Sequence, residues 1–473
     1  MALTATDLFA GAGGSSTGAT QAGVQIRIAA NHWRLAVDVH NENHPDTDHD
    51  CADISQVDPR RYPRTDLLLA SPECTWHSPA AGRRRISDHE PLPIDEKPLP
   101  AEAGERSRAT MWDVPRFAEY HRYRAVVVEN VAEASKWPPF RAWLMAMDSI
   151  GYQHEIVCHN SMHAQLAGLP APQSRDRLYV VFWRRGSKRP DLDRAQRPPA
   201  WCPRCEQVIE SRKAWKQRAL DSRIGKYRSQ YVYVCGGCGT TVEPGWLPAA
   251  SAIDWSLPTE RIGDRKRPLS EKTMARIRAG LARYQHEFIV PSGGSWNETP
   301  HPVTDPHRAF LTRDDRGLLV PVEGRDGKAA LTTSKPLRTM TTRNEAGIIT
   351  MLRGQNAAKL TTEPLDTFAA SGFHHGLLMP YYGQSKDARP TSQPIGTLTT
   401  TDRYALIPEP QIDPYDCGFR MLDPKESAAG MAFPTTYVWR GTKRERQKLA
   451  GNAVCPPNER DLVTVVAESL GAA

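Results

Sequence analysis

The chain has 473 residues, of which 39% are hydrophobic and 24% charged, so it can build two or three domains with proper cores. No segment reaches the length of an apolar transmembrane helix, and the first residues lack a basic start and a long apolar run. These features argue against a membrane protein, and we expect a soluble, cytoplasmic one. Nine cysteines, with two Cys-x-x-Cys pairs, favour metal binding and catalysis over a disulfide framework.

Positive charge is concentrated in one part of the chain. The net charge of +7 is modest, but Arg184 to Arg228 holds fourteen Lys and Arg against five Asp and Glu. Such an excess suits contacts with phosphate backbones. An ordinary solvated surface is the alternative, so this feature only supports nucleic-acid binding.

The first predicted element is a strand from about Thr6 that leads into the glycine-rich turn Gly11-Ala-Gly-Gly14 and a helix ending near Gly23. Glycines let the backbone approach a ligand closely, and the start of a helix offers free N–H groups. The spacing differs from the dinucleotide fingerprint, and the Lys-Ser/Thr of a P-loop is missing. Neither nucleotide class is therefore favoured.

A second strand is predicted at Val24–Ala30, with Trp33 just after its carboxyl end. After a helical stretch, Asp53 offers a carboxylate near the same edge. Three loops at one sheet edge thus supply glycine backbone, an aromatic face and an acid, which suits an adenosine-like cofactor.

The apolar run Asp66–Ala70 predicts a buried parallel strand that opens onto Cys74. A thiol at this edge is placed for nucleophilic chemistry, whereas the alternative is a small buried hydrophobic residue. Residues 79–106 are rich in Pro and Arg without periodicity, which is typical of a lid or a binding loop.

Three further strands are predicted, at Arg124–Val131, His154–His159 and Arg177–Trp183. The first carries Glu129 near its end, and this residue is either a surface carboxylate or an acid beside Cys74. Before the last strand, Arg175 and Arg177 bring two guanidiniums together for carboxylate, phosphate or base contacts.

Five motifs in this order and approximate spacing resemble those of the cytosine-5 DNA methyltransferases. The likeness covers residues 1 to about 184 and about 416 to 473. It implies a discontinuous, Rossmann-like α/β domain that uses S-adenosylmethionine. The motifs are Asp7-Leu-Phe-Ala-Gly-Ala-Gly-Gly14, the Pro-x-Cys loop at Cys74, Glu129-Asn-Val131, Gln173-x-Arg175-x-Arg177 and Gly451-Asn-Ala-Val454.

The resemblance also implies roles for individual residues. Cys74 would add to C6 of cytosine, and Glu129 would act as the acid or hydrogen-bond partner at N3. Arg177, with Arg175 nearby, would anchor the base, which must flip out of the duplex while the 79–106 loop closes over it. The implied cofactor site comprises Phe9, Ala10, Gly11, Gly13, Gly14, Trp33, Asp53, Ile54 and Asn452.

Three positions depart from the family pattern. Glu73 and Thr75 flank the cysteine where the family usually has Pro and Gln, and His32 stands where an acid usually holds the cofactor ribose. An inward carboxylate would raise the thiol pKa, so we expect Glu73 to point away. Glu42 or a water would substitute at the ribose, and an unusual alkyl donor is the remaining alternative.

Two cysteine pairs predict a metal site in the middle of the chain. Cys202 and Cys205 are separated from Cys235 and Cys238 by 29 residues, and Tyr231-Val-Tyr-Val234 is typical of a zinc-ribbon strand. Four thiolates form a closed, structural zinc site, and the alternative is four reduced free thiols. The basic residues nearby predict a DNA-contacting insert.

A repeat occupies about residues 300–408. Four Pro- and Thr-containing units start at Pro306, Pro336, Pro364 and Pro394, at intervals of 30, 28 and 30, and each is followed by an apolar run. Thr-rich alternation with Gly and Pro predicts short strands that stack into one β-rich body. This body is either a scaffold or part of the DNA-reading surface.

The predicted organisation is a catalytic domain in two parts, 1–184 and 416–473, around a β-rich target-recognition region, 185–415, with its zinc ribbon at about 198–245. The predicted function is methyl transfer to C5 of cytosine in duplex DNA, by a monomer. The alternatives are an RNA cytosine-5 methyltransferase and a DNA-binding protein with a degenerate site. The recognition sequence and any role in restriction–modification stay open.

Overall fold

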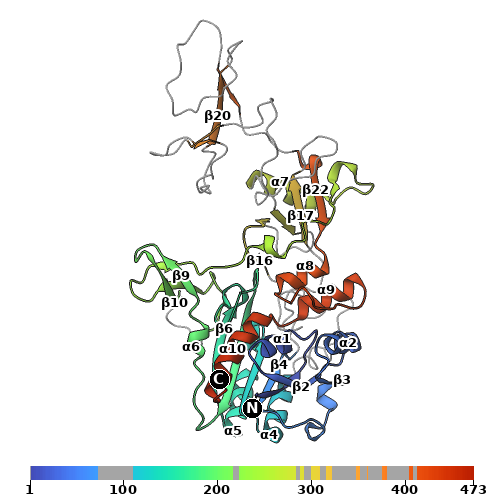
Figure 1. The fold of residues 1–473 in the computed structure, drawn as a ribbon, viewed down its shortest axis with the longest axis vertical. Coiled ribbons are helices and arrows are strands. Elements are labelled where there is room, and N and C mark those ends of the chain that lie inside the picture. Colours follow the sequence, from blue (N-terminus) through green and yellow to red (C-terminus); the bar gives the residue numbers. More distant parts are fainter. Residues whose placement is uncertain are drawn as a thin grey trace, which may run out of the picture. The chain divides into compact units, whose positions relative to one another are not determined.

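The computed structural model (Figure 1) describes residues 2–72, 110–216, 223–283, 288–291, 300–308, 316–321, 348–351, 359–360, 375–380, 404–407 and 413–472. The chain forms two compact units. The first comprises Met1–Glu260, Leu269–Leu319 and Phe419–Ala473, and the second comprises Arg261–Pro268 and Val320–Gly418. The domain boundaries expected at 184 and 416 stay predictions.

A seven-stranded sheet forms the centre of the first unit, in the order β3-β2-β1-β4-β5-β8-β6. The strands from β3 to β5 run parallel, and β8 is antiparallel to both of its neighbours, β5 and β6. Their bounds are Thr4–Leu8 (β1), Gln25–Ala30 (β2), Asp48–Asp50 (β3), Leu67–Ala70 (β4), Ala125–Asn130 (β5), Tyr152–Asn160 (β6) and Asp176–Arg184 (β8).

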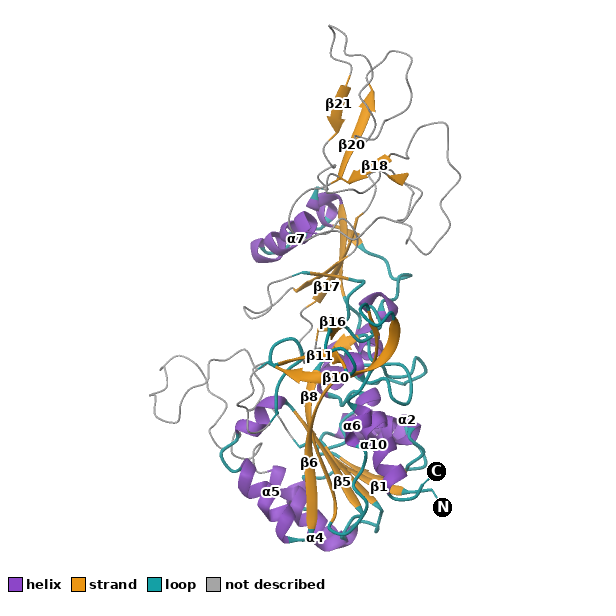
Figure 2. Cartoon of the chain, turned by 90° about the vertical axis from the view of Figure 1, so that its left-hand side faces the viewer, coloured by secondary structure: helices purple, strands orange, loops and turns teal. Residues whose placement is uncertain are grey.

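The position of strand β4 in the middle of the sheet explains why its sequence is continuously apolar. All four of its residues are buried, because alternate side chains enter two different cores. Leu68 packs with Val114 and Trp143 of helices α4 and α5, whereas Leu67 and Leu69 pack in a second core. Figure 2 shows helices on both faces of the sheet. The predicted buried parallel strand is confirmed.

The second core joins the two ends of the chain. It contains Ala5 of β1, Ala19 of α1 and the apolar face of α10, including Leu462 and Val466. The first unit therefore has the predicted α/β fold, and its last helix, α10, packs against its first helix, α1. The helices of this part are α1 (Gly14–Gln21), α2 (Arg34–Asn43), α4 (Asp113–His121), α5 (Phe140–Ser149), α6 (Leu192–Ala195), α8 (Pro424–Gly430), α9 (Lys443–Asn452) and α10 (Pro456–Ser469).

The four predicted metal ligands belong to a separate four-stranded antiparallel sheet, in the order β12-β11-β10-β9, and to its turns. We call residues 199–242 the cysteine module. Its strands are Pro199–Cys202 (β9), Gln207–Trp215 (β10), Tyr231–Cys235 (β11) and Thr241–Val242 (β12), so the strand predicted before the second pair is confirmed.

The apolar runs of the repeat are all strands, as predicted. The run of the first copy lies in β17 (Arg316–Pro321), which pairs with β14 (Phe288–Pro291). The other three lie in a different sheet, in the order β19-β18-β20-β21, so the four copies do not form one continuous sheet. Its strands are Ile348–Met351 (β18), Lys359–Leu360 (β19), His375–Pro380 (β20) and Tyr404–Ile407 (β21). The Thr-rich parts of the repeat lie outside the described residues.

The other described elements are short strands and one longer helix. Strand β7 pairs in parallel with β16, which brings residues 173–174 beside residues 307–308. Within the described parts of the chain, no helix is both long and apolar enough to cross a membrane. The remaining bounds are Gln173–Ser174 (β7), Glu260–Arg261 (β13), His301–Pro302 (β15), His307–Arg308 (β16), Cys417–Met421 (β22) and Glu271–Arg283 (α7).

Candidate active site

The predicted cofactor loop follows β1 at the carboxyl edge of the sheet. Phe9 has a φ of 60°, Gly11 of 56° and Gly13 of 89°, so the backbone here takes left-handed conformations that ordinary residues rarely adopt. A Cβ added to Gly11 would meet only the carbonyl oxygen of Phe9, at 4.0 Å. The backbone at Gly11 therefore forms an open cradle just before α1, which fits an S-adenosylmethionine site, whereas a Cβ on Gly13 would lie 2.6 Å from Tyr437 Oη. Ala10 is buried, and its N–H donates to the carbonyl of Ala30 at 3.1 Å.

Gly14 is required for a different reason, the close approach of the C-terminal segment. A Cβ built on Gly14 would lie 2.0 Å from the carbonyl oxygen of Val454. That distance is far inside van der Waals contact, and the obstacle is backbone, which cannot rotate away. The first and the last predicted motifs therefore touch through this glycine.

Replacing Gly14 with alanine should lower the free energy of unfolding by about 3 kcal/mol, because α1 and the Val454 segment must separate. Urea unfolding measures this change. Gly245→Ala is the matched control, since its Cβ would meet only Gln165 Oε1, at 3.9 Å. That variant should stay within about 0.5 kcal/mol of the wild type. Equal stability of the two variants would contradict the close approach.

A buried polar network beneath the loop was not predicted from the sequence. Asp7 accepts hydrogen bonds from the hydroxyls of Ser15 and Ser16 at 2.5 and 2.6 Å, and Ser16 Oγ lies 2.9 Å from His40 Nε2. Burial raises the pKa of Asp7 to about 6. His44 adds to the network through Thr17, at 3.2 Å, and burial lowers its pKa to about 4. These groups fix the start of α1, and only their three-dimensional contacts reveal them.

The other predicted cofactor residues lie at the ends of neighbouring elements. Trp33 is half-buried at the start of α2, and Lys448 Nζ lies 4.5 Å from its ring centroid. Asp53 is exposed, and its carboxylate accepts from Ser55, whereas the Ile54 side chain lies in the core. Asn452 is exposed at the end of α9. Their contacts with a cofactor stay predictions.

The structure describes only some of the residues at which the sequence departs from the family pattern. His32 is exposed at the end of β2. Glu42, the suggested ribose partner, forms an ion pair with Arg440. Cys74 and Glu73 lie outside the described residues, so the expected orientation of Glu73 stays a prediction. The last described residue before them, Pro72, accepts a hydrogen bond from Asn130 Nδ2 at 3.3 Å. This bond ties the start of the Cys74 loop to the end of β5.

Glu129 and Arg177 form a direct ion pair, with 2.8 Å between Glu129 Oε1 and Arg177 Nε. Their side chains are 12% and 14% exposed, so the pair is largely shielded yet reachable from one side. Glu129 is next to last in β5, and Arg177 is second in the antiparallel β8. The two motifs therefore meet because β8 inserts beside β5, at the edge where the Cys74 loop begins.

Arg175 has different surroundings. It is 3% exposed, and its Nη2 donates at 3.1 Å to the carbonyls of both Gly451 and Ala453. These contacts tie the strand that leads into Arg177 to the C-terminal segment at the end of α9. The structure therefore gives Arg175 a tethering contact that the sequence did not indicate, and its predicted part in anchoring the base stays a prediction.

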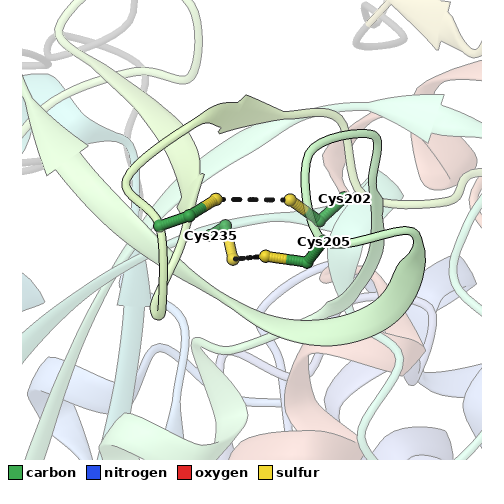
Figure 3. A group of neighbouring side chains, drawn as sticks. Cys202, Cys205 and Cys235 are labelled. Atoms are coloured by element: carbon green, nitrogen blue, oxygen red, sulfur yellow. Dashed lines mark hydrogen bonds between the residues drawn. The ribbon is translucent and has the colours of Figure 1, made fainter.

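The four module cysteines converge on one point. Cys202 Sγ lies 3.5 Å from Cys238 Sγ, and Cys205 Sγ lies 3.9 Å from Cys235 Sγ. Figure 3 shows the side chains of Cys205 and Cys235 pointing toward each other, with Cys202 beside them. All four sulfurs lie within 4.8 Å of one another. Sulfurs in a disulfide are about 2.05 Å apart, whereas a zinc tetrahedron with 2.3 Å bonds has edges of about 3.8 Å. The arrangement therefore fits a tetrahedral metal ion better than disulfides.

The fold is an α/β domain in which the glycine loop and the Glu129–Arg177 ion pair lie at the ends of strands of one sheet. Residues 3–233 match the model of the family described as C-5 cytosine-specific DNA methylase. Over these residues the chain is similar to the C-5 cytosine-specific DNA methylases. The matched range includes Glu129, Arg177 and the first of the two cysteine pairs.

Individual relatives are similar over part of their length. Type II methyltransferase M.HgiDI of Herpetosiphon aurantiacus is 28% identical over 185 residues, 38% of this chain and 52% of the relative. Type II methyltransferase M.AgeI of Thalassovita gelatinovora is 34% identical over 187 residues, 37% of this chain and 38% of the relative. The chain thus matches about half or less of each. The crystal structure of a Spodoptera frugiperda DNMT2 mutant aligns over 99% of both chains, with 13% identity and a TM-score of 0.47.

Proposed function

We propose that this chain transfers a methyl group from S-adenosylmethionine to C5 of cytosine in duplex DNA. The observation that carries the proposal is the Glu129–Arg177 ion pair at 2.8 Å. It unites two sequence motifs at the sheet edge that also holds the glycine cradle. The family match over residues 3–233 supports the same reaction.

In this proposal each residue of the edge has one task. The Cys74 thiolate adds to C6 of the flipped cytosine, because C5 alone is a poor nucleophile. Glu129 gives a proton or a hydrogen bond to N3, which lets electron density reach C5. Arg177 holds the Glu129 carboxylate in place and adds positive charge beside the base. Bound S-adenosylmethionine would supply the electrophilic methyl group to C5, and loss of the C5 proton then releases the Cys74 thiolate from C6.

We also propose that Cys202, Cys205, Cys235 and Cys238 hold a structural zinc ion. Two of the cysteines are buried and two are half-buried, and four thiolates leave no open position for substrate. The aromatic cluster of Tyr227, Tyr231 and Tyr233 packs directly against them. The ion would therefore stabilise the cysteine module and take no part in methyl transfer.

Covalent trapping tests the reaction. A long duplex of mixed sequence with 5-fluorocytosine at every cytosine position should form a denaturation-resistant adduct with the chain in the presence of S-adenosylmethionine, because fluorine at C5 blocks release of the enzyme. Cys74→Ser should form no adduct and should still bind the duplex.

Three results would count against the proposal. Methyl transfer by Cys74→Ser would exclude the thiol mechanism. Transfer of labelled methyl groups to tRNA but not to duplex DNA would favour the RNA enzyme. Tight DNA binding by the wild type without any adduct would favour a DNA-binding protein with a degenerate site.

A further inference from the structure

A short turn of the cysteine module contacts β8, which carries Arg177, and the segment that follows β5, which carries Glu129. This turn, Ile224–Arg228, precedes β11. Its residues are more than forty positions from either member of the pair in the sequence. The pair and the turn nevertheless belong to the same compact unit.

The first contact is made beside Arg177. The backbone N–H of Tyr227 donates to Asp176 Oδ1 at 2.9 Å, and Asn160 Nδ2 donates to the same oxygen at 3.0 Å. Asp176 directly precedes Arg177, and its carbonyl accepts from Arg177 Nη1 at 2.9 Å. The turn therefore forms a hydrogen bond with Asp176, the same residue whose carbonyl accepts a hydrogen bond from the Arg177 guanidinium.

The second contact is made beyond Glu129. Lys226 Nζ lies 2.6 Å from Glu133 Oε1, in the short 3₁₀ helix Ala132–Lys136 (η5) that follows β5. Adjacent residues of the turn thus hold the segments after Glu129 and before Arg177. One turn therefore contacts the segment after Glu129 and the residue before Arg177.

The turn itself is firmly anchored. His163 packs edge-on against Tyr227 and Tyr233, with ring centroids 4.6 and 5.0 Å away. Gly225 N–H donates to Cys158 Sγ at 3.3 Å, and Met162 shares a core with the module's tyrosines. Because β6 and the segment after it supply these contacts, the module is docked on the catalytic sheet.

We propose that the cysteine module positions the Glu129–Arg177 pair for methyl transfer, through Lys226 and the Tyr227 N–H. This role rests on the proposed function. It goes beyond that function because it assigns Lys226, which touches neither DNA nor cofactor in the proposal, to the positioning of the reacting residues. A half-exposed ion pair contributes little to global stability, so removing it should disturb the alignment and leave the fold intact.

Lys226→Met tests this role in single-turnover methyl transfer to duplex DNA. At saturating DNA and S-adenosylmethionine, its rate should fall by about threefold to tenfold, the coupling typical of contacting residues. The KM for DNA, the zinc content and the melting temperature should stay at wild-type values. Lys136→Met is the matched control, because Lys136 is an exposed lysine of the same helix η5, and its rate should stay within about twofold.

A charge swap sharpens the test. The single change Glu133→Lys should slow transfer, and adding Lys226→Glu should restore most of the rate, because the ion pair re-forms with reversed polarity. A raised KM for DNA with an unchanged rate would make Lys226 a phosphate contact and overturn the proposal. An unchanged rate in Lys226→Met would also overturn it. A wild type that transfers no methyl group would refute the proposed function instead.

Discussion

Replacing Glu129 with glutamine is expected to lower the single-turnover rate of methyl transfer by a factor of about 10² to 10⁴, the usual contribution of general acid–base catalysis. Glutamine has nearly the same shape, and its Oε1 can still accept from Arg177 Nε, which lies 2.8 Å from Glu129 Oε1 in the wild type. It has no acidic proton to give to N3. The variant therefore separates proton donation from the positioning of Arg177.

Two measurements make this result specific. Binding of duplex DNA should be nearly unchanged, because Glu129 does not carry the charge that attracts phosphates. Glu119→Gln is the control, since Glu119 is an exposed carboxylate on α4, and its rate should match the wild type. A Glu129→Gln rate within threefold of the wild type would mean that the carboxyl proton is not used.

Short sequence patterns were sufficient to predict the strands and the loop that form the carboxyl edge of the central sheet. Continuous apolar runs predicted β4 and β5 because parallel strands are buried on both faces. Glycine spacing predicted the loop after β1, whereas only the resemblance to the cytosine-5 DNA methyltransferases implied that Glu129 and Arg177 share a site. The helix α5 was not among the predicted elements, although its apolar residues Phe140, Trp143 and Met147 are buried.

Contacts between distant segments could not be predicted. The sequence gives no sign that Gly14 touches Val454, that Arg175 bonds the end of α9, or that Lys226 meets Glu133. Such pairs depend on how β8 inserts between β5 and β6 and on where the cysteine module docks. Both are set by packing over the whole unit, and no spacing within a single motif encodes them.

The second large effect concerns the metal site. The double variant Cys235→Ser and Cys238→Ser should lose one equivalent of zinc per chain, because two ligands cannot retain the ion. Structural zinc contributes about 10–16 kcal/mol of apparent binding free energy in small zinc domains. Most of the folding energy of the cysteine module should therefore disappear. Metal analysis of the purified chain measures the stoichiometry, and limited proteolysis reports the local unfolding.

Cleavage should concentrate within residues 199–242, while the catalytic sheet, with its own two cores, resists. Cys51→Ser is the control, because Cys51 is exposed and lies outside the cluster, and it should keep both the zinc and the proteolytic pattern. If the wild type contains no zinc, the four thiols need another explanation. If the double variant loses zinc but the module stays protected, the tyrosine cluster alone would be sufficient to fold it.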